Sequence, residues 1–173
     1  MMGFLLLLPF LMLRFGLLAL LNKEAVKRAA HFPPLRKTEK IWYWVYQISA
    51  LAMYVFPFFL KIHIVPLAWC ITGIAVYSTG AILLTIALIN FAAPSESGVT
   101  QSGLYRLSRN PLYVAYFVFF LGCALLTQSL MLLSIVLVLQ ISTHRVILAE
   151  ERWCAEQFGE AYLHYVNRVR RYI

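Results

Sequence analysis

The chain alternates between long apolar runs and short polar segments. The apolar runs cover residues 1–21, 41–60, 67–91, 111–126 and 130–148. A helix needs about 20 apolar residues to cross the hydrocarbon core of a bilayer, because each residue adds about 1.5 Å. The last two runs are shorter and only residues 127–129 separate them, so we expect a short helical hairpin there. The pattern therefore predicts an all-α, polytopic membrane protein with about five transmembrane helices.

Proline and glycine predict where several of these helices begin, bend or end. Pro57 should kink the second helix, because proline has no backbone N–H to donate. Pro111 should open the fourth helix, with Asn110 as its N-cap. From residue 144 onward the chain is charged, which predicts a helical tail that leaves the membrane. Gly159 is a plausible C-cap within this tail, after which we expect a second amphipathic helix.

Composition agrees with a membrane protein, since 62% of the 173 residues are hydrophobic. We expect one integral-membrane domain, residues 1–173, in which residues 1–91 form the first three spans. Residues 92–173 then hold the hairpin, the tail and the motifs described below. Cysteine and histidine show no metal-ligand spacing, so we expect no metal site.

The formal net charge of +8 comes from basic residues that flank the apolar runs. Basic residues at such positions set topology and meet anionic lipid headgroups, so we expect membrane lipids and not nucleic acid as partners. Short basic segments stay in the cytosol, which predicts an outside N-terminus and a cytosolic C-terminus. Arg14 lies inside the first run near its end. We interpret it as a snorkelling side chain, although a charge within a membrane helix is also a functional hint.

Two polar segments on the expected cytosolic face carry candidate chemistry. The first, GLYRLSRNPLY, covers residues 103–113, and the second contains the neighbours Glu150 and Glu151. Adjacent residues on a helix point about 100° apart, so one acid should face the helix bundle and the other water or an arginine. A solvated helix end is the alternative interpretation for both. Arg145, one to two turns earlier, is a candidate for binding an anionic group, with snorkelling as the alternative.

These segments together resemble the integral-membrane methyltransferases typified by isoprenylcysteine carboxyl methyltransferase, and the related phospholipid N-methyltransferases. The family pattern runs GxYxxxRHPxY, then EE, then FGxxYxxYxxRV, and the resemblance covers about residues 98–169. Five residues fall on the first motif: Gly103, Tyr105, Arg109, Pro111 and Tyr113. Asn110 replaces the family's histidine, as in many bacterial-type members, while Glu150 and Glu151 fall on the paired acids. Arg170 stands where proline is usual, which puts the last turn of the match in doubt.

The resemblance implies an enzyme of the methyltransferase class that uses S-adenosylmethionine. It implies a site at the cytosolic membrane edge, which a lipophilic or lipidated substrate reaches from the bilayer, and we expect a prokaryotic inner membrane. The expected cofactor-binding residues are Gly103, Tyr105, Asn110, Pro111, Tyr113, Glu150 and Glu151. The expected catalytic residues are Arg109, Arg145 and Glu150.

The sequence leaves the substrate open. Carboxyl O-methylation of an isoprenylcysteine-type substrate is the first expectation, and N-methylation of a phospholipid is the second. Membrane sterol reductases, which use NADPH, resemble the same half of the chain, and Cys154 gives them slight support. A non-enzymatic lipid-binding protein is the remaining alternative, in which the polar residues only anchor helices.

Overall fold

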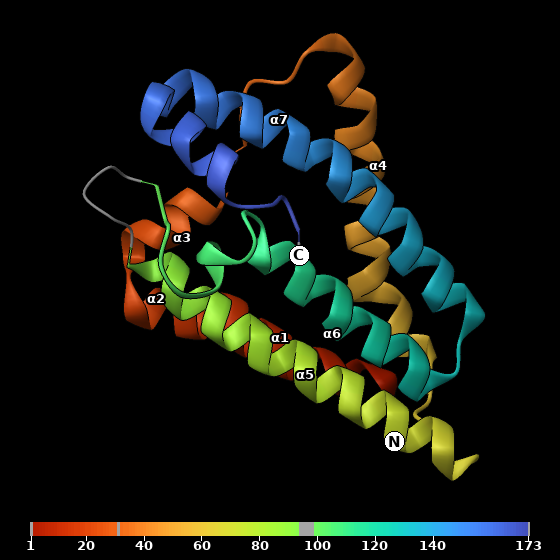
Figure 1. Cartoon of the computed structure of the whole chain (residues 1–173). Coiled ribbons are helices and arrows are strands. Elements are labelled where there is room, and N and C mark those ends of the chain that lie inside the picture. The colour runs from red at the N-terminus through yellow and green to blue at the C-terminus, as the bar shows by residue number, and fades with distance from the viewer. Residues whose placement is uncertain (1, 31, 94–98, 173) are drawn as a thin grey trace.

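The computed structural model describes residues 2–30, 32–93 and 99–172, and their regular secondary structure is helical, which confirms the all-α class (Figure 1). Residues 94–98, which include the start of the resemblance, lie outside this description. The elements are η1 (Gly3–Leu6), α1 (Leu7–Leu11), η2 (Met12–Leu17), α2 (Leu18–Leu21), α3 (Lys23–Ala30), α4 (Lys37–Val55), η3 (Phe56–Phe59), α5 (Leu67–Ala92), η4 (Gly103–Arg106), α6 (Pro111–Thr127) and α7 (Leu130–Arg168).

Three helical stretches of the described chain are long and apolar enough to cross a membrane: Gly3–Leu21, Leu67–Ala92 and Leu130–Arg168. The protein is therefore an integral membrane protein. Helix α6 is apolar and has only 17 residues, so the first arm of the expected hairpin is short, whereas the second arm, α7, is longer than expected. Helix α4 has 19 residues and carries three charged side chains in its first turn. The count of five spans and their orientation therefore stay predictions.

Proline and glycine interrupt the helices at the predicted residues, although α4 begins and ends earlier than the expected range 41–60. Helix α4 ends at Val55, and a 3₁₀ turn containing Pro57 follows it. The hairpin turn consists of Gln128, in a left-handed conformation, and Ser129, whose hydroxyl accepts a hydrogen bond from a backbone N–H of α7. Gly159 interrupts α7 at φ 51° and ψ −130°, so a separate helical tail follows it. Glycine adopts positive φ at little cost, whereas other residues are strained there.

Helices α5 and α6 lie side by side and approach unusually closely. A Cβ atom added at Gly80 would overlap the backbone of Phe119, and one added at Gly122 would overlap the backbone of Tyr77. Small residues allow such contact between membrane helices, where packing rather than the hydrophobic effect drives association. The two glycines therefore fix how α6 sits on α5.

The N-terminal helix and the pair α4 and α7 complete the bundle. Helix α4 runs along α7, and the N-terminal helix packs on α5 (Figure 1). Phe10 joins the core, with its ring centroid 4.9 Å from that of Phe120 and 5.6 Å from that of Phe119. After Gly159 the chain turns back and ends beside the start of α6. This return brings the two polar segments of the sequence into contact.

Candidate functional site

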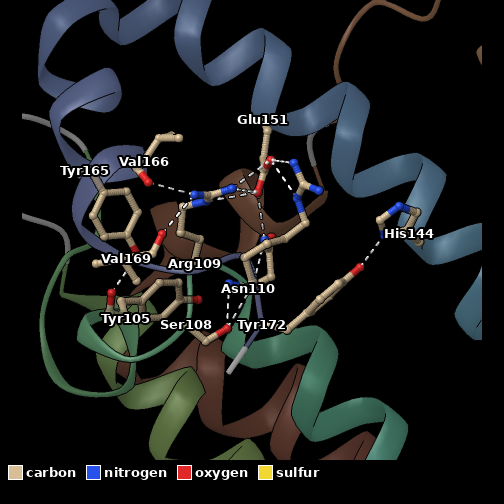
Figure 2. A network of polar contacts seen from close by, with 11 residues as sticks. Tyr105, Ser108, Arg109, Asn110, His144, Glu151, Tyr165, Val166, Val169 and Tyr172 are labelled. Carbon is tan, nitrogen blue, oxygen red and sulfur yellow. Dashed lines mark hydrogen bonds and ion pairs between the residues drawn. The ribbon is translucent and has the colours of Figure 1, made fainter.

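Glu151 is the centre of a buried charge network, which we call the C-terminal tie and define as Glu151, Arg109 and Arg171 (Figure 2). Arg109 donates from Nε to Glu151 Oε1 at 3.1 Å and from Nη2 to Oε2 at 3.3 Å. Arg171 donates from Nε and Nη2 to Glu151 Oε2 at 3.0 and 2.8 Å. The side chains of Arg109 and Glu151 are only 8% and 12% exposed. This burial argues against the interpretation of Glu151 as a solvated helix end.

Arg109 also holds the backbone of the tail. Its Nη1 donates to the carbonyls of Val166 and Val169, at 3.0 and 2.9 Å, and its own N–H donates to the carbonyl of Arg170 at 2.9 Å. The hydrogen bond to Glu151 raises the pKa of the Arg171 guanidinium, which keeps this group charged. Arg109 thus closes the loop before α6 onto the end of the chain.

Further contacts fasten the last residues of the described chain. The Ser108 hydroxyl donates to the carbonyl of Arg171 at 3.2 Å. The Tyr165 hydroxyl donates to the carbonyl of Tyr105 at 2.7 Å, and the Tyr172 hydroxyl lies 2.7 Å from Nδ1 of His144 on α7 (Figure 2). The tail is therefore bonded to the loop before α6 and to α7.

Asn110 stands at the predicted N-cap position, but its side chain does not cap the helix. Its Nδ2 donates instead to Glu151 Oε1 at 3.2 Å and to the Arg171 carbonyl at 3.3 Å. The capping role predicted for the side chain is therefore wrong. The reason is the returning tail, which supplies a charged acceptor.

Glu150 has different surroundings from Glu151, as their relative rotation on a helix predicts. The Tyr113 hydroxyl donates to Glu150 Oε1 at 2.7 Å. Oε2 of Glu150 has no hydrogen bond, and Glu150 forms no ion pair, among residues 2–30, 32–93 and 99–172. One carboxylate oxygen of Glu150 therefore remains open to a ligand.

A cavity of about 670 Å³ lies beside these residues, which is within the usual range of ligand sites. It is lined by α3, α4, α6, α7, the N-terminal helix and the tail. Six of the predicted site residues line it: Tyr105, Arg109, Asn110, Tyr113, Glu150 and Glu151. Its aromatic wall includes Phe158, Tyr162 and Tyr116. A carboxylate, tyrosine hydroxyls and aromatic rings can together hold a positively charged, partly aromatic ligand.

Three predicted site residues lie elsewhere. Gly103 has φ 57° and is close to Asn90, where a Cβ would overlap the asparagine side chain, and Asn90 Oδ1 accepts the N–H of Leu104 at 3.0 Å. Pro111 occupies the first position of α6 and is buried. Arg145 is exposed and lies over the ring of Trp42, at 5.1 Å from its centroid. The first two have local structural reasons for their residue types.

Sequence reasoning missed several polar groups at or near the cavity. No motif singled out Arg171, and its carboxylate partner lies 20 residues earlier in the chain. Arg14 and Arg28, from the N-terminal region, line the cavity. Arg152 pairs with Glu39 on α4 at 2.9 Å, which ties α7 to the first polar loop. A local sequence pattern cannot indicate these ion pairs or cavity positions, since each depends on contact between segments that are distant in the sequence.

A search for similar proteins gave one result. A family model described as phospholipid methyltransferase matches residues 61–161, which is more than half of the chain. No curated protein and no solved structure matches it significantly. The matched segment contains α5, α6 and both glutamates, whereas the N-terminal helices and Arg171 lie outside it.

Proposed function

This chain belongs to the phospholipid methyltransferase family, and we propose that it transfers a methyl group from S-adenosylmethionine to a lipid at the cytosolic membrane face. The observation that carries this proposal is Glu150, a carboxylate with one open oxygen on the wall of a large aromatic cavity. The cytosolic location rests on the basic segments around the site, which the positive-inside rule assigns to the cytosol.

The residues that line the cavity suit the methyl donor. S-adenosylmethionine supplies, when bound, an activated methyl group on a positively charged sulfur. Glu150 would accept hydrogen bonds from its ribose hydroxyls or its amino group, and aromatic rings such as Tyr162 and Phe158 would attract its positive charge. Asn110 and Tyr113 line the same cavity as Glu150, and the Tyr113 hydroxyl is hydrogen-bonded to the Glu150 carboxylate.

An amine in a phospholipid headgroup is the acceptor that this site favours. A protonated amine must lose a proton before its nitrogen can form a bond to the methyl carbon. Glu150 can take that proton, with the Tyr113 hydroxyl orienting its carboxylate. Positioning of the two reactants in one cavity supplies much of the remaining rate enhancement.

Carboxyl O-methylation of an isoprenylcysteine-type lipid is the second candidate. The motif of residues 103–113 and the paired acids favour it, because they resemble that branch of the superfamily. A carboxylate is already nucleophilic and needs no base, so Glu150 would then serve only the methyl donor. A negatively charged acceptor would also be repelled by Glu150, which is why we place this reaction second.

Arg109 enters the proposal as a positioning residue. Its guanidinium donates to Glu151 and to the carbonyls of Val166 and Val169 in the tail. It would therefore act by holding the tail over the cavity. An anion-binding role for Arg145 stays a prediction, and the variant Arg145→Gln tests it through the KM for the lipid acceptor.

Cofactor binding and product analysis test the function together. Purified protein should bind S-adenosylhomocysteine, and labelled S-adenosylmethionine should transfer its methyl group to a lipid identified by mass spectrometry. Glu150→Ala should weaken binding or turnover, while Glu160→Ala, on the exposed side of the tail, serves as the matched control. Binding of NADPH with no binding of S-adenosylhomocysteine would instead support a reductase. If the protein binds neither cofactor and tolerates Glu150→Ala as well as it tolerates Glu160→Ala, the result would support a lipid-binding role.

A further inference from the structure

Two arginines of the N-terminal region line the same cavity as Glu150. Arg14 comes from η2, a π-helical turn in the first membrane helix, and Arg28 comes from α3. A π turn inside a helix often marks a functional position. Both arginines lie outside residues 61–161, so they add positive charge to a cavity whose acids belong to the family-matched segment.

Neither guanidinium is saturated by residues that the structure describes. Arg14 Nη2 donates to the carbonyl of Ala29 at 3.0 Å, and Arg28 Nη2 donates to the carbonyl of Phe91 at 2.9 Å. The Arg28 guanidinium also lies over the Phe91 ring, and its Nε is buried with no hydrogen-bond partner among residues 2–30, 32–93 and 99–172. A guanidinium has five N–H donors, and neither arginine has a carboxylate within ion-pair distance in the described part of the chain.

The positively and negatively charged residues line one cavity. Tyr46 and Tyr116 line it together with Arg14 and Glu150. A ligand in this space therefore meets cations toward the N-terminal helix and a carboxylate toward α7. An unpaired cation at membrane depth is costly, and an anionic ligand would offset that cost.

We propose that Arg14 and Arg28 form an oxyanion site that binds the phosphate of a phospholipid headgroup at the N-terminal side of the cavity. The proposal rests on the proposed function for its lipid ligand. Guanidinium groups match phosphate oxygens in paired hydrogen bonds, and two of them from separate helices can reach different oxygens. A headgroup held by its phosphate at Arg14 and Arg28 would extend its remaining part toward Glu150.

Lipid binding, measured apart from methyl transfer, tests the site. The probes are radiolabelled phosphatidylethanolamine and diacylglycerol with the same acyl chains, which lacks the phosphate. The purified full chain in detergent is compared with Arg14→Gln, Arg28→Gln and the exposed control Arg106→Gln. Each cavity variant should raise the Kd for phosphatidylethanolamine by about tenfold, the effect of losing a charge-assisted hydrogen bond. The Kd for diacylglycerol should change less than about twofold in the cavity variants. In Arg106→Gln, the Kd values for both ligands should also change less than about twofold.

Further arms separate the outcomes. If a glutamine variant fails to fold, as judged by gel filtration, Arg14→Lys and Arg28→Lys replace it, and a smaller loss of affinity is expected because lysine lacks the planar fork. Unchanged affinity for phosphatidylethanolamine in the folded variants overturns the site. An equal loss of diacylglycerol binding in the cavity variants overturns the phosphate assignment, because diacylglycerol has no phosphate. Displacement of the lipid by an equal concentration of inorganic phosphate overturns the lipid source. Arginine-dependent lipid binding without methyl transfer to any lipid refutes only the proposed function.

Discussion

The C-terminal tie and the cavity wall next to it differ in how fully their charged groups are paired. In the tie, Glu151 accepts hydrogen bonds from two arginines and from Asn110. On the cavity wall, Glu150 accepts one hydrogen bond from the described part of the chain, from the Tyr113 hydroxyl, and Arg14 donates there to one backbone carbonyl. Saturated charges hold a structure in place, whereas incompletely paired charges remain able to bind a ligand. Two adjacent acids in the sequence therefore have separate tasks.

The largest expected effect is loss of the tie. Glu151→Ala leaves Arg109 buried without its anion, which should reduce the free energy of unfolding by about 3 kcal/mol or more. Thermal unfolding in detergent and limited proteolysis of the tail measure this. Glu160→Ala, which removes an exposed acid of the same tail, is the control. Equal unfolding temperatures and equal tail protection for Glu151→Ala and wild type would erase the distinction between the two regions.

The cavity wall should show the opposite behaviour. Glu150→Gln keeps the shape of the side chain but removes the proton acceptor, so methylation of an amine should fall by about 100-fold. Stability should change by less than about 1 kcal/mol, because no ion pair is broken. Steady-state kinetics with S-adenosylmethionine and phosphatidylethanolamine, beside Glu160→Gln, give the comparison. A variant with full turnover would show that Glu150 is not the base.

Gly159 connects the two regions, because it turns the tail back toward the loop before α6. Gly159→Ala meets no neighbouring atom, so its whole effect should be backbone strain of about 2 kcal/mol. Gly16→Ala, where an added Cβ also meets no atom and φ is not positive, should not reduce stability, because alanine favours a helix interior more than glycine does. Thermal unfolding of both variants measures the difference. Equal stability for the two would mean that the turn at residue 159 carries no strain.

The smallest effect is expected within the tie itself. The Arg171 side chain is 35% exposed, so Arg171→Gln should cost only about 1 kcal/mol, and Arg109 still neutralises Glu151. About 1 M salt should narrow the gap between variant and wild type, because exposed charges are screened. Unfolding at low and high salt, with Arg168→Gln as control, measures this. A gap that salt does not change would place Arg171 with the buried part of the tie.

Local features of the fold could be predicted from the sequence. The apolar runs located the helices, and Gly159 marked the break in α7, because these signals depend on a few neighbouring residues. Pro57 was expected to kink the second helix, and the helix ends just before it. The opposite surroundings of Glu150 and Glu151 followed from helix geometry alone.

Contacts between distant segments could not be predicted in the same way. Glu151 pairs with Arg171, which no sequence motif singled out, and the Asn110 side chain bonds to Glu151 and the tail instead of capping α6. Arg14 was interpreted as a snorkelling residue, whereas it lines the cavity. An apolar run alone does not indicate which face of a helix borders lipid and which borders a cavity. Such assignments need the relative placement of helices.

The close packing of α5 against α6 at Gly122 can influence the cavity from a distance, because α6 carries residues of both regions. Gly122 is nine positions from Tyr113, which corresponds to about 13 Å along the helix axis. A methyl group at Gly122 would push against the backbone of Tyr77 and pivot α6, so the Tyr113 hydroxyl would move relative to Glu150. The position of Tyr113 relative to Glu150 thus depends partly on a glycine outside the cavity. A substitution at that helix contact can misplace the Tyr113 hydroxyl without changing any residue of the cavity.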